Sequence, residues 1–212
     1  MSFDRIGKTP FIIAEIGHNH QGNIETAFEL IKQAKLCGAN AVKLQKRSNK
    51  HLYTKKFYDE KYDHKNSYGK TYGEHREFLE FDYEQYKDLQ SFAKDNKIEL
   101  FATPFDIESL EFLEKLEMPA YKIASADLTN TPLQKEISKL KKPIFLSTGG
   151  GTLADVKRAV ENIVSENSNL SIMHCTASYP ADIEDMNLNV ITQYKKAFKD
   201  YVLGLSDHEN GI

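Results

Sequence analysis

The chain has 212 residues, of which 40% are apolar and 28% are charged, and its formal net charge at pH 7 is -3. This composition is typical of a globular protein of one domain or slightly more, and it excludes collagen-like, disordered and disulfide-rich classes. It also excludes a broadly basic nucleic-acid binder, and no apolar run approaches the length of a transmembrane helix. Because residues 1–17 show no signal-peptide pattern, we expect a cytoplasmic protein in which Cys37 and Cys175 are buried free thiols.

Short apolar runs alternate with longer segments of helical periodicity. The first predicted strand, residues 11–14, is a continuous apolar run typical of a strand buried on both faces. A helix follows over residues 25–37, with Gly38 where a helix C-cap belongs, and then a strand over residues 41–44. Residues 46–77 are rich in Tyr, Lys and His and show little periodicity, so we predict a long functional loop or irregular insertion there.

The alternation then resumes to the end of the chain. The predicted elements are helix 83–96, strand 99–102, helix 107–116, strand 121–124, helix 132–140 opened by Pro132, strand 143–146, helix 153–165, strand 170–173, helix 187–198 and strand 201–204. Such alternation predicts a parallel sheet with right-handed crossovers, either doubly wound or closed as a (β/α)8 barrel.

Polar residues follow or end every predicted strand. They are Glu15, Lys43, Gln45, Thr103, Asp106, Lys122, Ser125, Ser147, Thr148, His174, Thr176, Ser206, Asp207 and His208. In a barrel all these ends meet at one mouth, whereas a doubly wound sheet uses only its switch point. We therefore predict an α/β fold of the (β/α)8 TIM-barrel type over residues 1–212, in which seven strands leave the barrel one short.

Two of these residues are lysines, which are costly inside a strand unless they are paired or face a site. Lys43 and Lys122, with hydroxyls at other strand ends, indicate a site for a small, phosphorylated anion. The alternative for each lysine is a side chain that only reaches out to solvent. The glycine run in residues 147–152 is either a phosphate-binding nest or a flexible turn.

Histidines and carboxylates complete the set of candidates. His18, His20, His174 and His208 are candidate metal ligands or acid–base groups, with a purely structural role as the alternative for each. The candidate bases are Glu15, Asp106, Asp127 and Asp207. Residues 51–56 carry Lys and Tyr and are interpreted as a solvated loop face rather than a nucleic-acid contact, given the acidic balance.

Eight segments in order resemble the sialic acid synthase family, which includes N-acetylneuraminate synthase and its pseudaminic, legionaminic and spore-coat-polysaccharide relatives. They are AEIGHNHQG at 14–22, VKLQ at 42–45, YGEHREFLEF at 72–81, ATPFD at 102–106, PAYKIASAD at 119–127, KPIFLSTGGG at 142–151, HCTASYPA at 174–181 and GLSDH at 204–208. The resemblance implies a (β/α)8 barrel that condenses phosphoenolpyruvate with N-acetylmannosamine or a related amino sugar, using Mn²⁺ or Mg²⁺.

The resemblance also implies roles for single residues. The positions that hold phosphoenolpyruvate in the family are matched by Lys43, Thr103, Lys122, Ser125, Ser147 and Ser206. His208 matches a metal ligand, and Glu15 and Tyr179 match positions near the sugar. Asn66 stands for the sugar-binding asparagine of the long loop, and Asp127 stands where relatives often carry Glu. The candidate catalytic residues are Glu15, Lys43, Lys122 and Asp127.

Relatives continue past GLSDH with a helix, an eighth strand that carries a second metal histidine, and an antifreeze-like domain that reaches the partner of a homodimer. We therefore expect a synthase-type barrel that is incomplete at its C-terminus, either a fragment or a degenerate stand-alone protein. Two alternatives stay open: another barrel that condenses phosphoenolpyruvate with an aldose, and a non-catalytic remnant that binds a sugar or pairs with a full-length relative.

Overall fold

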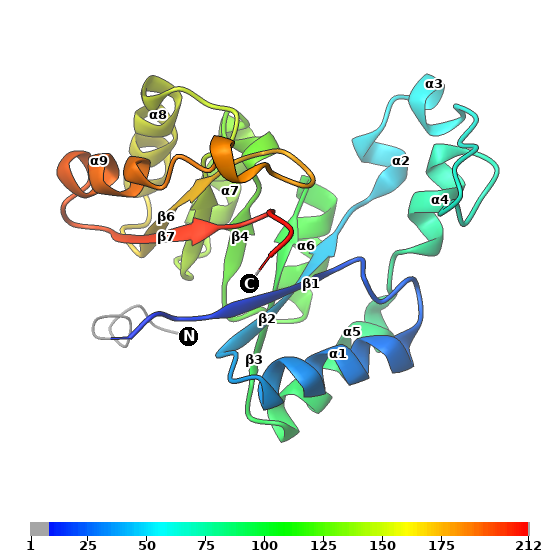
Figure 1. Ribbon diagram of the computed structural model, residues 1–212. Helices are drawn as coiled ribbons and strands as arrows, with labels where there is room; N and C mark the ends of the chain where they lie inside the picture. The colour runs from blue at the N-terminus through cyan, green and yellow to red at the C-terminus, as the bar shows by residue number, and fades with distance from the viewer. Residues whose placement is uncertain (1–8, 212) are drawn as a thin grey trace. The chain divides into compact units, whose positions relative to one another are not determined.

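The computed structural model describes residues 9–211 of the chain, and these form two compact units. One unit comprises residues 9–119 and the other begins at residue 120. Each unit is built from parallel strands and helices that alternate along the chain (Figure 1). No helix in the described part of the chain is long and apolar enough to cross a membrane.

The unit of residues 9–119 contains a three-stranded parallel sheet. Its main elements are β1 (Ile13–Gly17), α1 (Ile24–Leu36), β2 (Ala41–Lys46), α5 (Tyr83–Asp95), β3 (Glu99–Pro104) and α6 (Ile107–Lys115). β2 pairs with β1 and with β3, so that Lys43 lies opposite Glu15 on one side and Phe101 on the other. Helices α1 and α5 lie side by side against these strands (Figure 1). The core between them contains fully buried apolar side chains, among them Ile31, Leu44 and Leu89.

The segment between β2 and α5 is not the irregular loop that the sequence predicted. It contains three short helices, α2 (Asn49–Leu52), α3 (Lys55–Tyr58) and α4 (Tyr72–Phe78). The side chains of Thr54 and Thr71 cap α3 and α4, and the rings of Tyr53, Phe57 and Tyr72 contact one another. Helices this short show no apolar periodicity, because side-chain caps and aromatic contacts stabilise them rather than an apolar stripe along one helix face.

The unit that begins at residue 120 contains a four-stranded parallel sheet. Its elements are β4 (Tyr121–Ile123), the 3₁₀ helix η2 (Ser125–Asp127), α7 (Thr131–Lys139), β5 (Ile144–Ser147), α8 (Leu153–Val164), β6 (Leu170–Cys175), the 3₁₀ helix η3 (Ile183–Asp185), α9 (Asn189–Ala197) and β7 (Val202–Ser206). β5 pairs with β4 and β6, and β6 pairs with β7. α7 begins with Pro132 in its first turn, and Thr152 and Asp155 form a capping box at the start of α8.

Strand order decides between the two predicted architectures. In both units each strand pairs with the next along the chain, with no reversal of order. A doubly wound sheet requires such a reversal at its switch point, whereas a (β/α)8 barrel is built from sequential parallel neighbours. The fold is therefore α/β of the (β/α)8 barrel type, with seven strands among the described residues, as predicted.

Two local predictions were wrong. β1 begins at Ile13 and continues through Glu15, because the amide of Ile12 donates to the Asn40 side chain instead of entering the strand ladder. Ile12 is half exposed, so the start of this run is not buried on both faces. Cys37 is exposed at the C-cap of α1, where the chain turns at the surface, whereas Cys175 is buried as expected.

Candidate functional site

Three of the predicted site residues meet in the unit of residues 9–119. Lys43 lies within β2 and is only 3% exposed. Its ammonium forms an ion pair with the carboxylate of Glu15 on β1 and donates a 2.8 Å hydrogen bond to Oγ1 of Thr103 on β3. Parallel pairing produces this group, because Glu15 is the register partner of Lys43, and Thr103 is the partner of Gln45 two residues further along β2. We call Glu15, Lys43 and Thr103 the Lys43 group.

The two charges of the Lys43 group differ in their access to solvent. The Glu15 side chain is 46% exposed, whereas that of Lys43 is 4% exposed. A buried ammonium needs a counter-ion, and here the exposed carboxylate supplies it. An anionic ligand at Lys43 would take over that role and release Glu15 for another partner.

Hydroxyl groups gather around the glycine-rich turn of the other unit. Ser125, two residues past β4, accepts a 3.0 Å hydrogen bond from the amide of Gly149 through its Oγ. A Cβ at Gly149 would lie 2.9 Å from that oxygen and 3.0 Å from the carbonyl of Cys175, so only glycine allows this approach. Ser147 ends β5 and is fully buried, and its hydroxyl has no hydrogen-bond partner among residues 9–211.

The glycine run itself does not end in an open helix N-terminus. Thr152 and Asp155 cap each other's backbone amides at the start of α8. Thr148 donates to the carbonyl of Met173 and accepts from the hydroxyl of Tyr194. The phosphate-nest interpretation of residues 147–152 therefore depends on the buried Ser147 hydroxyl rather than on the amides of α8.

Lys122 and Asp127 flank the turn that carries Ser125. Lys122 is the central residue of β4 and is half-buried. Asp127 ends η2 and is 8% exposed, and its Oδ1 accepts a 2.9 Å hydrogen bond from Asn130. Asp127 thus contributes to the turn after β4, and its predicted catalytic role stays a prediction.

His208 and Tyr179 lie together beyond the end of β7. Their ring centroids are 4.1 Å apart, and Tyr179 is 77% exposed. Nδ1 of His208 lies 2.9 Å from the carbonyl oxygen of Thr176, which assigns the proton to Nδ1 and leaves the Nε2 lone pair for a ligand. Ser206 is the last residue of β7 and pairs with Cys175 of β6.

Among the described residues, one histidine is suited to bind the predicted metal ion, but no complete set of ligands is present. Within residues 9–211, no three His, Cys, Asp or Glu side chains lie together in a way that could hold a metal ion. A ring whose second nitrogen contacts a carbonyl is typical of metal-ligating histidines, so His208 fits the role of a single ligand. His174 makes the same kind of contact, with Nε2 2.6 Å from the carbonyl of Met186, but it is only 7% exposed, whereas His208 is partly exposed.

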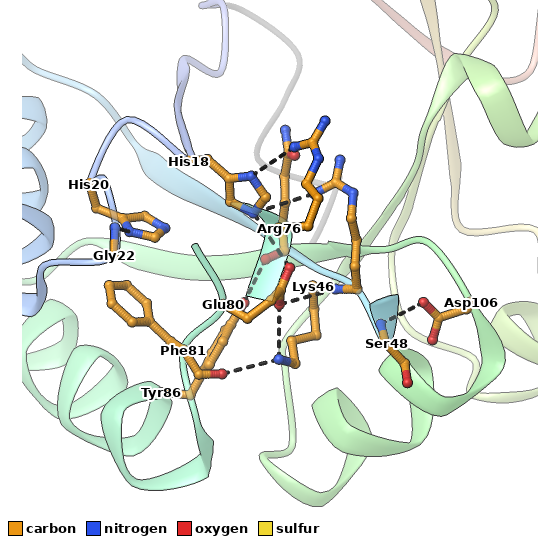
Figure 2. Close-up of polar contacts among 12 residues, drawn as sticks. His18, His20, Gly22, Lys46, Ser48, Arg76, Glu80, Phe81, Tyr86 and Asp106 are labelled. Carbon is orange, nitrogen blue, oxygen red and sulfur yellow. Dashed lines mark hydrogen bonds and ion pairs between the residues drawn. The ribbon is translucent and has the colours of Figure 1, made fainter. Parts of the chain in front are cut away.

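The structure also shows a charged cluster that the sequence analysis missed, formed by His18, Lys46, Arg47, Arg76 and Glu80 (Figure 2). We call it the His18 cluster. Glu80 accepts hydrogen bonds from the Lys46 ammonium at 2.9 Å and from the backbone amide of Arg47 at 3.2 Å. Its carboxylate lies 3.6 Å from Nε2 of His18. The only sequence signals were His18 itself and the strand ends before His18 and Arg47.

His20, the second histidine of the HNH motif, has a structural position. It is 2% exposed and stacks on Phe81 at 4.1 Å, and its Nδ1 accepts the amide of Gly22 at 3.1 Å (Figure 2). Burial lowers the pKa of His20 to about 4, with the neighbouring His18 adding to the effect. Burial also lowers the pKa of His18, although Glu80 opposes it. Both rings are therefore neutral at pH 7.

Asn66 lies in the insertion between β2 and α5. It is exposed in the turn between α3 and α4, where its backbone amide contacts Nδ1 of His64 at 3.3 Å. None of the hydrogen bonds in the described part of the chain joins its side chain to another candidate. Its predicted contact with a sugar stays a prediction.

Comparison with known proteins identifies the family of the chain. The model of the NeuB family matches residues 30–212. The N-acetylneuraminate-9-phosphate synthase of Mus musculus is 42% identical over 207 residues, which cover 97% of this chain and 58% of the relative. The N,N'-diacetyllegionaminic acid synthase of Campylobacter jejuni is 37% identical over 210 residues, or 97% of this chain and 62% of the relative.

A solved structure also matches nearly the whole chain. The N-acetylneuraminic acid synthetase of Leptospira borgpetersenii, in complex with citrate, superposes with a TM-score of 0.84 at 29% identity. The match covers 97% of this chain and 68% of that one. The chain spans less than two thirds of the length of the curated relatives named above. On the family model and these identities, the chain belongs to the NeuB family.

Proposed function

We propose that the full-length protein condenses phosphoenolpyruvate with N-acetylmannosamine or a related N-acetylated amino sugar, giving a nonulosonic acid and inorganic phosphate. The observation that carries this proposal is the Lys43 group: a 3% exposed lysine inside a strand, held by an exposed carboxylate and a buried hydroxyl. The curated relatives named for the synthesis of N-acetylneuraminate 9-phosphate and N,N'-diacetyllegionaminic acid support the same class of product.

The reaction joins two carbon atoms and releases one phosphate. The C3 methylene carbon of phosphoenolpyruvate attacks the aldehyde carbon of the sugar, whose oxygen takes a proton and becomes a hydroxyl group. Positive charge develops at C2 of phosphoenolpyruvate, water adds there and loses a proton, and phosphate leaves. The protein has to hold two substrates in one orientation and stabilise anionic oxygens, which are the effects that positioned charges supply.

Lysine and hydroxyl side chains bind phosphoenolpyruvate in this proposal. Lys43 and Lys122 neutralise its phosphate and carboxylate, and hydrogen bonds to its oxygens come from Thr103, Ser125, Ser147 and Ser206. Ser147 supports the assignment, because a buried hydroxyl without a partner in the described chain costs stability unless a ligand satisfies it.

Glu15 changes partner during binding. When the anion takes Lys43, the half-exposed carboxylate of Glu15 becomes free to accept a sugar hydroxyl or to move a proton. Tyr179, Asn66 and Asp127 are further candidates for the sugar side of the reaction.

We also propose a divalent ion, Mn²⁺ or Mg²⁺, with Nε2 of His208 as one ligand. Such an ion would polarise the aldehyde oxygen of the sugar as a Lewis acid. Among residues 9–211 no group of three His, Cys, Asp or Glu side chains could hold the ion. The full-length protein is further proposed to be a homodimer.

Replacement of Lys122 tests the proposal. We expect Lys122→Ala to lower kcat/KM for the condensation by a factor of about 100 or more, as the loss of one positioned charge does. The matched control is Lys139→Ala, which removes an exposed lysine paired with Glu136 on α7 and should leave turnover unchanged. Near-normal turnover by the Lys122 variant would overturn the assignment.

A further inference from the structure

Two of the four arginines in the chain converge on one histidine in the His18 cluster. Nη1 of Arg47 lies 3.3 Å from Nε2 of His18, and Nη1 of Arg76 lies 3.4 Å from Nδ1 of the same ring. Figure 2 shows Arg76 beside His18 and Glu80 below it. The imidazole is thus placed between two guanidinium groups.

This arrangement has more donors than acceptors. A neutral imidazole has one acceptor nitrogen, while a guanidinium group only donates, so at most one of the two contacts is a hydrogen bond. Within residues 9–211, neither guanidinium group forms an ion pair with a carboxylate. Glu80 pairs with neither arginine side chain: Lys46 and the backbone amide of Arg47 occupy its Oε2, and its Oε1, 3.6 Å from Nε2 of His18, has no hydrogen-bond partner among the described residues.

Both arginines are held in place by neighbouring aromatic residues. The guanidinium group of Arg47 lies over the ring of Phe105, 3.7 Å from its centroid. Arg76 donates from Nε and Nη2 to the hydroxyl of Tyr72 at 2.9 and 2.8 Å. Burial, and then the charge of Arg76, lower the pKa of Arg47. The two guanidinium groups are thus fixed, repel each other and have unused N–H donors. A planar guanidinium group of this kind can donate two hydrogen bonds to one phosphate or carboxylate group.

The arginine pair lies beyond the ends of β1 and β2, whereas Glu15 and Lys43 lie within those strands. His18 directly follows β1 and Arg47 directly follows β2. Lys43 and Arg47 are four residues apart along one extended segment, which places their Cα atoms about 13 Å apart. The arginines are therefore suited to a second anionic group, at the end of a ligand remote from the Lys43 group.

We propose that Arg47 and Arg76 bind a phosphate group carried by the acceptor sugar, so that this protein prefers a 6-phosphorylated N-acetylhexosamine to the free sugar. This inference rests on the proposed function and specifies its acceptor. The aldehyde carbon of the sugar reacts with phosphoenolpyruvate, and the phosphate on the terminal carbon is the part of the acceptor farthest from that bond.

Calorimetric titration of the full-length protein tests the inference, with N-acetylmannosamine 6-phosphate, N-acetylmannosamine and phosphoenolpyruvate as separate ligands. We expect Arg47→Ala and Arg76→Ala to weaken binding of the sugar phosphate roughly 10- to 100-fold, as loss of a charged hydrogen bond does. Binding of the other two ligands should not change. Arg47→Lys keeps the positive charge but loses the planar guanidinium group. Its affinity for the sugar phosphate should therefore lie between those of wild type and Arg47→Ala.

Arg158→Ala is the matched control, because that arginine is exposed on α8 and pairs with Asp155. It should leave all three affinities unchanged. Thermal melts check that each variant folds, and Arg47→Lys replaces Arg47→Ala in the comparison if the alanine variant does not.

Three results would overturn the inference: equal wild-type affinity for both sugars, equal losses for both sugars in the arginine variants, or loss of phosphoenolpyruvate binding instead. The last result would assign the pair to phosphoenolpyruvate. A wild-type protein that binds the sugar phosphate through these arginines but does not bind phosphoenolpyruvate would contradict the proposed function and leave this inference standing.

Discussion

Buried polar side chains at the carboxyl ends of the strands differ in how well the protein itself satisfies them. Lys43 has both a counter-ion and a hydrogen-bond acceptor, whereas the Ser147 hydroxyl has no partner in the described chain. Removing a hydroxyl that makes no hydrogen bond relieves a desolvation penalty, but removing one that does make a bond loses stability. Stability and ligand binding should therefore respond in opposite directions at Ser147.

Ser147→Ala is expected to leave the free energy of unfolding unchanged or to raise it by up to about 1 kcal/mol, while weakening binding of phosphoenolpyruvate about tenfold. The matched control is Ser138→Ala, because the equally buried Ser138 donates a 2.6 Å hydrogen bond to the carbonyl of Gln134. That variant should lose about 1 kcal/mol. Urea denaturation and calorimetry measure the two effects, and equal destabilisation by both replacements would contradict this account of Ser147.

His20 makes the stability of the fold depend on pH. Its folded pKa of about 4 lies below the unfolded value near 6.5, so the unfolded chain takes up the proton first as the pH falls. Neutral His20 therefore leaves the free energy of unfolding at its full value above pH 6.5. Between pH 6.5 and 4 that free energy falls, by about 3 kcal/mol at most.

Urea denaturation at pH 7.5 and pH 4.5 should therefore show a smaller pH dependence in His20→Gln than in wild type. The glutamine keeps an acceptor for the amide of Gly22, and the shifted pKa of His18 is common to both proteins. Identical pH dependence in the two proteins would show that His20 is not the titrating group.

Residues at strand ends could be predicted from the sequence, and those in the insertion could not. Lys43 and Thr103 were found because a polar residue in an apolar run stands out, and the structure brings them together with Glu15. Arg76 and Glu80 lie in a segment without periodicity, where nothing in the sequence places them beside His18. Their positions depend on the fold of α4, which tertiary contacts determine.

At the scale of elements, the turn between β1 and α1 illustrates how a close approach restricts the sequence. Gly22 has a φ of +73°, and a Cβ there would overlap the carbonyl oxygen of Phe78, which is a backbone atom. Gly38, at the end of α1, has a φ of +88°, but the space that a Cβ would occupy there is open. An alanine at Gly22 would therefore meet both backbone strain and steric overlap, whereas an alanine at Gly38 would meet backbone strain alone.

Gly22→Ala is expected to lower the free energy of unfolding by about 3 kcal/mol or more, since both strain and overlap oppose the new methyl group. Gly38→Ala, which meets strain alone, should cost about 1 kcal/mol. Chemical denaturation of both variants checks the difference. Equal losses would mean that the chain around Phe78 moves away without cost.

Most elements could be predicted because their apolar periodicity is long enough to recognise. α5 and α8 were placed to within a residue, and α8 also has the Thr152–Asp155 capping box as a start signal. β1 was displaced because an apolar run does not show where the ladder of hydrogen bonds to the next strand begins. α2, α3 and α4 were missed because four to seven residues are too few to show a helical period.

At the scale of the whole molecule, sequential parallel pairing in both units and membership of the NeuB family indicate the same architecture. The barrel class followed from alternation together with polar strand ends, which is a property of the whole chain rather than of any one segment.

The most direct test of the central claim is acceptor-dependent release of phosphate from phosphoenolpyruvate by the full-length protein with Mn²⁺. We predict that inorganic phosphate appears only when N-acetylmannosamine or its 6-phosphate is present, in equal amount to a nonulosonic acid identified by mass spectrometry. Phosphate release that does not depend on the sugar, or no release with either sugar, would contradict the proposal that this protein is a nonulosonic acid synthase.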